Sequence, residues 1–401
     1  MVARSVAWFS LGYQYDYLTF LSVFIVIYSM FMLDCLPFVN STCMEISSPQ
    51  DDSSTLPSYD VGLAGNLFGL PKVSADDADV VIVPVPWDVT TSYRPGTSGA
   101  PNAILEASSQ IDYYVPGIRD TTSITYGMTD SLDDIATLNK TWRSEAEKII
   151  HAQEQGLSIE GELADTLARV NSISSEVNDR VRDVCRHYLD QDKTVVLLGG
   201  DHSTPLGFMQ ALAEKFGEYG VLHIDAHADL RVAYEGFKYS HASIMYNAAE
   251  EIPSIGKFVQ VGIRDVSEAE VMYAKNSSGR IDMYQYEDIF DRQAEGKTWK
   301  EITDEIVNKL PQQVYISFDI DGLKREYCPS TGTPVPGGLE YQQAIYIIKK
   351  ILESGKKIIG ADLNEVGFNP EEEWDSVVGM RMLFRLCVTA AASQGKLKHE
   401  F

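Results

Sequence analysis

The chain has 401 residues, of which 44% are hydrophobic and 23% charged, and these values are ordinary for a globular protein. They exclude a disordered, a collagen-like or a disulfide-rich small protein. The formal net charge is −25, from 33 Lys and Arg against 58 Asp and Glu, so nucleic-acid binding is disfavoured and a cationic substrate would be attracted.

The amino-terminal segment, residues 1–44, differs from the rest of the chain. It contains an uncharged apolar run over 17–33, which is at the short limit for a membrane span, and no small-x-small cleavage site follows. A membrane anchor, a secretory signal and a start-site artefact with the natural start at Met44 all stay open. We therefore expect a polar leader over 45–78 and a single catalytic domain over 79–396.

From residue 79 the chain alternates short apolar, β-branched runs with amphipathic stretches. Strands are predicted at 80–85, 194–198, 221–224, 258–263, 314–320 and 357–363, and helices at 205–216, 299–310 and 341–352, among others. A polar insertion over about 131–191 predicts two more helices on either side of 158–167. Apolar strands separated by helices predict a three-layer α/β/α fold with a mostly parallel central sheet.

Acidic and histidine residues gather where four of these strands end. The motifs are GGDHS at 199–203, DAHAD at 225–229, DID at 319–321 and NE at 364–365. The carboxyl ends of parallel strands lie at one edge of a sheet, where ligand crevices form. Six acidic side chains and two histidines are therefore expected together at that edge.

The spacing of these residues indicates a metal site. In an extended DAHAD segment, Asp225, His227 and Asp229 point to one face. If these two carboxylates converge with Asp319 and Asp321, they repel one another unless cations lie among them. Each motif alone is also typical of a turn or of solvated loop acids. Together they form an oxygen-rich set without thiolates, which suits Mn²⁺ better than structural zinc.

In these motifs the chain resembles the ureohydrolase superfamily of arginases, agmatinases, guanidinobutyrases and formiminoglutamases. GGDHS, HIDAHAD, SFDIDGL with PSTGTPVPGGL, and ADLNEV match the family blocks in order, and VPWDVT with RPGTSGAPNAI matches upstream. The resemblance covers about residues 78–395. It implies an arginase-like fold and an enzyme that hydrolyses a small cationic guanidino compound to urea and an amine.

The resemblance also implies two manganese ions per subunit. The implied ligands are His202, Asp225, His227, Asp229, Asp319 and Asp321. Asp225 and Asp319 would bridge the ions, His202 and Asp229 would bind only the first, and the remaining two only the second. Because all six are present, a degenerate, non-catalytic relative is disfavoured.

Further residues match the family's catalytic and substrate-binding positions. His241 stands at the place of the proton-shuttling histidine, and the metal ligand Asp229 is also expected to take part in catalysis. Thr333 and Glu365 match residues that hydrogen-bond the guanidinium group, and Glu270 matches an arginase-like position that binds substrate. The roles are chemically reasonable, because a carboxylate can orient a planar cation and an imidazole can protonate a departing amine.

Departures from the family pattern bear on the substrate. Ser267 replaces an acid with which arginases bind the α-amino group of arginine, and Lys324-Arg325 replaces the usual Asp-Pro. We expect hydrolysis of agmatine to putrescine and urea, a step of polyamine biosynthesis. Guanidinobutyrase, arginase and formiminoglutamase remain alternatives, the last if Arg231 binds a substrate carboxylate rather than a protein acid. A metal-bound scaffold without activity and a one-zinc deacylase of this fold are the rivals outside the class.

Further expectations concern the residues next to the site, the cellular location and the oligomeric state. His223, inside a strand, is expected to be a core histidine or to support a ligand, and Asp201 to orient His202 or to cap the next helix. The five cysteines are scattered without a CxxC pair, which favours a reducing, cytoplasmic location. The resemblance implies a homo-oligomer, a trimer or hexamer, and membrane association is expected only if the apolar segment is retained.

Deletion of residues 1–43 should leave a folded, active enzyme, because no predicted strand or helix of the catalytic domain lies there. Solubility and urea release of the truncated protein, compared with the full chain, check this expectation. An insoluble truncation would show that the segment belongs to the folded structure.

Overall fold

A computed structural model describes residues 62–130 and 133–401, and the predictions for residues 1–44 and for the first half of the polar leader lie outside the described residues. The described residues contain one sheet of eight strands in the order β2-β1-β3-β8-β7-β4-β5-β6, and all neighbouring strands are parallel. The strands are β1 (Val80–Val85), β2 (Tyr126–Met128), β3 (Thr194–Gly199), β4 (Tyr219–Ile224), β5 (Ile255–Ile263), β6 (Ile281–Gln285), β7 (Gln313–Asp319) and β8 (Lys357–Asn364).

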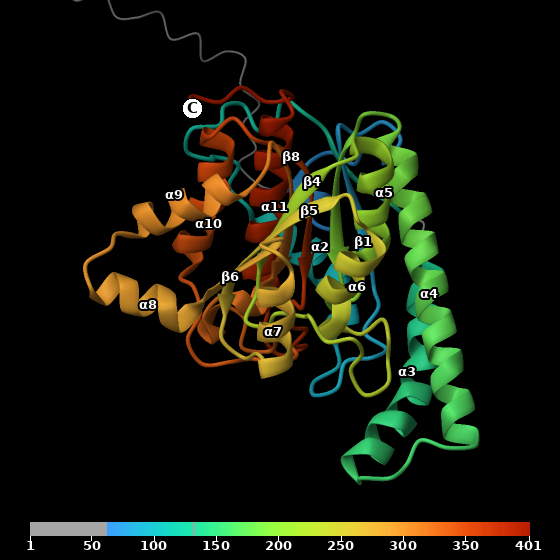
Figure 1. Ribbon diagram of the computed structural model, residues 1–401. Helices are drawn as coiled ribbons and strands as arrows, with labels where there is room; N and C mark the ends of the chain where they lie inside the picture. The colour runs from blue at the N-terminus through green and yellow to red at the C-terminus, as the bar shows by residue number, and fades with distance from the viewer. Residues whose placement is uncertain (1–61, 131–132) are drawn as a thin grey trace, which may run out of the picture. The chain divides into compact units, whose positions relative to one another are not determined.

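Helices cover both faces of this sheet (Figure 1). They are α2 (Ala100–Ala107), α3 (Asp133–Glu154), α4 (Glu162–Leu189), α5 (Leu206–Phe216), α6 (Ile244–Glu251), α7 (Glu268–Asn276), α8 (Tyr286–Ala294), α9 (Trp299–Lys309), α10 (Tyr341–Glu353) and α11 (Trp374–Ser393). One hydrophobic core joins the sheet to α2, α9, α10 and α11, and the other joins it to α3, α4, α5 and α6. The predicted three-layer α/β/α fold is therefore confirmed.

The continuous apolar runs of the central strands follow from burial on both faces. In β3, Val196 and Leu198 belong to one core, whereas Val195 and Leu197 belong to the other, because successive side chains of a strand point to opposite faces. Both sets must be apolar, which is why these strands could be recognised from the sequence.

The sequence did not predict β2 and β6. These two strands form the edges of the sheet. β2 has three residues, and β6 is partly exposed along most of its length. Edge strands are covered less completely than central ones, so the apolar pattern by which strands are recognised is weak in them.

The segment 131–191 contains α3 and α4, which form a helical hairpin beside α5 (Figure 1). The expectation that 158–167 separates the two helices was partly wrong, because α4 already begins at Glu162. Glu162 and Asp165 lie in its first turn, where negative charges are favoured by the helix dipole.

One helix in the described part of the chain, α11, is long and apolar enough to cross a membrane by length and composition. Most of it is buried among the other helices and the sheet, with 78% of the apolar window inside the structure. Core helices commonly have this composition, and α11 is one of them.

Candidate metal centre and active-site pocket

The strands that carry the predicted site residues are β3, β8, β7 and β4, and these are four consecutive strands in the middle of the sheet. Neighbouring strands lie about 4.8 Å apart, so side chains at their carboxyl ends come within contact of one another. The order of these strands in space differs from their order in the chain. The sheet therefore assembles one site from four distant segments.

The first group of side chains surrounds His202. Its Nδ1 atom lies 3.0 Å from Oδ2 of Asp225, 3.1 Å from Oδ2 of Asp229 and 3.3 Å from Oδ2 of Asp319. All four residues are at most 4% exposed. Around an octahedral divalent cation with bonds of about 2.1 Å, neighbouring ligand atoms lie about 3 Å apart. The spacing of this group matches that geometry.

A second group adjoins the first through Asp225. Nδ1 of His227 lies 3.4 Å from Oδ1 of Asp225 and 3.2 Å from Oδ2 of Asp321. Asp225 thus presents one oxygen to each group, as a bridging carboxylate does. Asp319 faces His202 with Oδ2, while its Oδ1 accepts a 2.8 Å hydrogen bond from the Asp321 amide. A bridging role for Asp319 stays a prediction.

The charges of these groups favour a cation. Burial, with Asp321 and Asp225 nearby, raises the pKa of Asp319 well above its ordinary value. Burial and Asp225 also raise the pKa of Asp229 to about 7. Buried carboxylates in contact cannot all be ionised unless positive charge lies among them. Two imidazoles and four carboxylates fit hard divalent cations, so the donor set is compatible with the metal implied by the sequence.

His202 is oriented by a chain of hydroxyl and carboxylate groups. Its Nε2 atom lies 2.9 Å from Oγ of Ser317, and that hydroxyl donates to Oδ1 of Asp362 at 3.2 Å. A proton on Nε2 leaves Nδ1 free to bind a cation. The sequence analysis missed Ser317, although its position two residues before Asp319 puts both side chains on one face of β7. Asp201 instead accepts hydrogen bonds from the amide and hydroxyl of Ser203 and from the hydroxyl of Thr91.

His223 supports Asp225. The Nε2 amide of Gln260 donates to Nδ1 of His223 at 3.0 Å and to the carbonyl oxygen of Ala228 at 2.6 Å. The proton of His223 is therefore on Nε2, which lies 2.8 Å from Oδ2 of Asp225. The ring lies among residues that could hold a metal ion. Its geometry favours a role in supporting Asp225 over direct binding of the ion.

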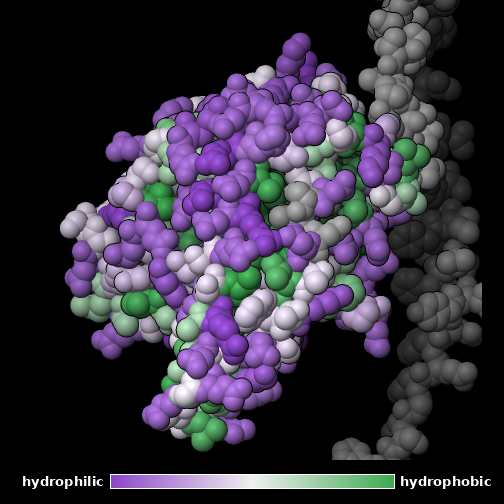
Figure 2. All heavy atoms as spheres, turned by 90° about the vertical axis from the view of Figure 1, so that its right-hand side faces the viewer, coloured by the Kyte–Doolittle hydropathy of each residue, from purple (hydrophilic) through white to green (hydrophobic). Residues whose placement is uncertain are grey.

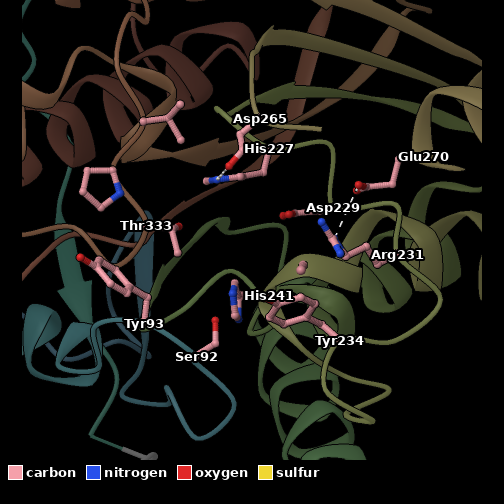
Figure 3. Close-up of a pocket in the computed structure, with 13 residues that line it drawn as sticks. Ser92, Tyr93, His227, Asp229, Arg231, Tyr234, His241, Asp265, Glu270 and Thr333 are labelled. Carbon is pink, nitrogen blue, oxygen red and sulfur yellow. Dashed lines mark ion pairs between the residues drawn. The ribbon is translucent and has the colours of Figure 1, made fainter. Parts of the chain in front are cut away.

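A cavity of about 260 Å³ opens beside the two groups (Figure 3). Residues from several loops line it, and they include Ser92, Tyr93, His227, Asp229, Arg231, Tyr234, His241, Asp265, Glu270 and Thr333. Thr333 donates a 3.3 Å hydrogen bond to Oδ2 of Asp321 and so lies directly beside the second group. Two of the predicted metal-binding residues, His227 and Asp229, thus line the same cavity as the predicted catalytic residue His241.

His241 begins a short 3₁₀ turn and is buried, and its Nδ1 atom has no hydrogen-bond partner. Burial, together with His227 and His202, lowers the pKa of His241 to about 3. The ring is therefore neutral at pH 7, and a protonated His241 would readily give its proton to a neighbouring base. The ring of Tyr234 lies edge-on to it, with 6.0 Å between the centroids.

Glu365 directly follows β8 and is 3% exposed. Its Oε1 atom accepts a 2.9 Å hydrogen bond from the His202 amide, while Oε2 is buried without a partner. Burial and Asp201 raise the pKa of this carboxyl well above its ordinary value. Glu365 and Asp229 also have positive φ angles of 59° and 54°, a strained conformation often found at functional sites.

Glu270 lines the cavity, but both of its oxygens are already engaged. Oε1 accepts from the Leu230 amide at 3.1 Å, and Oε2 accepts from the amide and hydroxyl of Ser267. Ser267 and Glu270 together form the capping box of α7. Its expected contact with substrate therefore stays a prediction, whereas its role in holding α7 and the loop at Leu230 is visible.

Arg231 lies beside Glu270, and 3.6 Å separate its Nε atom from Oε2 of that carboxylate. Its guanidinium group stacks over the ring of Tyr234, 5.0 Å from the centroid, and 43% of the side chain is exposed. Of the two roles expected for Arg231, the ion pair within the protein is present. Lys324 is also paired, with Glu340, and Arg325 points into solvent.

The sequence analysis also missed Arg264, which follows β5. Its guanidinium group donates to the carbonyl oxygens of Asp321 at 2.7 Å, Leu323 at 3.2 Å and Val335 at 3.1 Å. These bonds join two parts of the connection between β7 and α10, the part that carries Asp321 and the part that carries Thr333. No sequence signal pointed to this role, because backbone carbonyl partners leave no side-chain pattern.

The chain matches a known protein family over most of its length. The model of the Arginase family matches residues 78–388, which is most of the chain. The chain belongs to the arginase family. The predicted superfamily and the predicted enzyme class are thus confirmed, and this arginase-family protein is a hydrolase that acts on a guanidino compound.

Two relatives and one solved structure illustrate the similarity. N(1)-aminopropylagmatine ureohydrolase of Thermus thermophilus is 31% identical over 304 residues, which are 76% of this chain and 87% of the relative. Agmatinase of Pyrococcus horikoshii is 30% identical over 325 residues, covering 79% and 93%. The crystal structure of agmatine ureohydrolase of Thermoplasma volcanium has the same fold, with a TM-score of 0.58 and 23% identity over 79% of this chain and 92% of that one.

Replacement of Asp225 by alanine should abolish metal binding at both groups, because this carboxylate presents an oxygen to each. Metal content per chain, measured by elemental analysis after loading and desalting, checks the prediction. Asp291→Ala, at an exposed position of α8, is the matched control and should keep the wild-type content. Normal metal content in Asp225→Ala would contradict the assigned site.

Proposed function

We propose that this arginase-family protein is a binuclear manganese agmatinase that hydrolyses agmatine to putrescine and urea. The observation that carries the proposal is the position of Asp225, whose two oxygens face two separate groups of ligands beside one cavity. The neutral His241 and the unpartnered oxygen of Glu365 lie close to the same groups.

The residues of the chain fit the steps of this reaction. Two bound manganese ions would supply an activated water and stabilise negative charge on it. The unpartnered Oε2 of Glu365 can hold the guanidinium group by a charge-assisted hydrogen bond, and Thr333 can fix its orientation. The attacking oxygen forms a bond to the guanidinium carbon, and the bond from this carbon to the substituted nitrogen breaks. His241 accepts the proton of the water and returns it to the departing amine.

The mouth of the cavity favours a cationic tail. Asp265 lines it with a side chain that is 72% exposed, so a terminal ammonium group can meet a carboxylate there. Arg231, the basic residue at the same mouth, already faces Glu270. The position that would bind the α-amino group of arginine is occupied by Ser267, which caps α7.

A second candidate substrate is N(1)-aminopropylagmatine, after which the relative from Thermus thermophilus is named. Its longer tail carries an additional amine, and the exposed carboxylate of Asp265 would suit that group as well. Both substrates share the guanidinium group and differ only at the mouth of the cavity.

A urea-release screen with the manganese-loaded enzyme tests the proposal. The panel contains agmatine, N(1)-aminopropylagmatine, arginine, guanidinobutyrate, guanidinopropionate and formiminoglutamate, the last followed by its own product. We expect the largest kcat/KM for agmatine, and a larger value for a carboxylate-bearing compound would overturn the choice of tail. If no compound of the panel is hydrolysed, the result favours a metal-bound scaffold without activity. If the purified protein holds one zinc ion per chain, the result favours a deacylase of this fold.

His241→Phe should retain metal but reduce kcat by roughly 10²–10⁴-fold, the usual range for loss of a proton-transferring group. His151→Phe, at an exposed position of α3, serves as the control and should keep wild-type kinetics. Steady-state urea release together with metal content separates loss of chemistry from loss of metal. Unchanged kinetics in His241→Phe would remove its role in proton transfer.

A further inference from the structure

The helical hairpin of α3 and α4 makes polar contacts with two loops that line the cavity. We call residues 86–99, between β1 and α2, the first pocket loop, and residues 230–240, between β4 and α6, the second pocket loop. The outward face of the hairpin is largely hydrophilic (Figure 2). The residues on its inward face make the contacts with the two pocket loops.

Asn139 of α3 fixes the start of the first pocket loop. Its side-chain oxygen accepts from the Asp88 amide at 2.8 Å, and its Nδ2 atom donates to Oδ1 of Asp88 at 2.8 Å. The other carboxylate oxygen of Asp88 accepts from the amides of Gly96 and Ser98. Asn139 and Asp88 are 6% and 2% exposed. One buried amide of the hairpin thus holds the residue that closes this loop.

Arg143, one helical turn further along α3, contacts the same loop. Its Nη1 atom donates to the carbonyl oxygens of Val89 at 3.1 Å and Thr91 at 2.5 Å, and its side chain is only 15% exposed. The next residues are Ser92 and Tyr93, which line the cavity. The guanidinium group therefore fixes the backbone immediately before the cavity wall.

The second pocket loop contains a tight turn. The Tyr234 amide donates to the Phe237 carbonyl at 3.1 Å, and the Phe237 amide donates to the Tyr234 carbonyl at 2.9 Å. The two central residues, Glu235 and Gly236, have positive φ angles of 52° and 79°, as a type I′ turn requires. This conformation is unfavourable for a glutamate, so contacts from outside the loop are needed to hold it.

The hairpin provides these contacts. Gln153 of α3 donates to the Glu235 carbonyl at 2.6 Å, and Asn171 of α4 donates to the Gly236 carbonyl at 3.1 Å. Asn171 also accepts from the Lys238 amide at 2.8 Å. Both helices therefore hold the turn that presents Tyr234 to His241.

The two loops lie on opposite sides of the candidate proton-transfer residue. In Figure 3, Ser92 and Tyr93 lie on one side of His241 and Tyr234 lies on the other. We propose that the α3–α4 hairpin is a positioning element of the active site, which holds both loops and so sets the width of the cavity and the place of His241. Only the kinetic consequences of this proposal rest on the proposed function, because the contacts themselves do not depend on the substrate.

The two loops should have different effects on catalysis. Loosening the first loop with Arg143→Met displaces the wall at Tyr93, and we expect KM for agmatine to rise about tenfold with kcat nearly unchanged. Loosening the turn with Asn171→Ala displaces Tyr234 from His241, and we expect kcat to fall about tenfold with little change of KM. A general loss of folded protein would lower the apparent kcat of both variants, leave KM unchanged and speed amide exchange throughout the chain, whereas the faster exchange expected for each variant is confined to one loop.

Amide hydrogen exchange and steady-state kinetics of the manganese-loaded enzyme test this proposal together. Arg143→Met should speed exchange only in the first pocket loop, and Asn171→Ala only in the second. Lys148→Met on α3 and Ser172→Ala on α4 are controls at exposed positions of the same helices, and both should match the wild type.

Unchanged exchange in both loops, or faster exchange with wild-type kinetics, would overturn the proposal. If the wild type hydrolyses no compound of the guanidino panel, the proposed function fails. Faster exchange confined to the predicted loop would then still support the positioning role of the hairpin, and unchanged exchange would overturn it.

Discussion

The buried carboxylates at the carboxyl edge of the sheet impose the main constraint on this structure. Asp225, Asp229 and Asp319 lie around a single imidazole nitrogen, and burial and mutual repulsion raise the pKa of the last two. Such a cluster is unfavourable in the absence of positive charge. The surrounding structure must therefore hold the cluster together, and a bound divalent cation would turn the repulsion into attraction.

The parallel sheet provides this rigidity. β3, β8, β7 and β4 are adjacent in its middle and are packed on both faces by hydrophobic cores. Beside the cluster, Ser317 contacts His202 and His223 contacts Asp225, and these directional hydrogen bonds fix both residues. The ligands are thus supported by a rigid framework, and the strained backbone at Asp229 and Glu365 can persist because its neighbours determine it.

The wall of the cavity is built from loops, unlike the neighbouring cluster of carboxylates, which lies at the ends of strands. Loops that follow β1 and β4 form much of the wall, and side chains of the α3–α4 hairpin bond to the backbone of both. Arg264 similarly joins two parts of the connection between β7 and α10, at Asp321 and at Val335. The strands hold the residues that could bind a metal ion, whereas the shape of the cavity wall depends on side chains that bond to loop carbonyls.

The three-layer fold, the six central strands and the residues of the candidate metal centre could be predicted from the sequence. These follow from local patterns, since strands buried on both faces are continuously apolar and alternating ligands in DAHAD share one face. Only the folded arrangement shows that Glu270 also holds the loop at Leu230 and that Asn139 and Arg143 hold a distant loop. These contacts join residues far apart in the chain, often through backbone atoms, and backbone atoms are the same in every sequence.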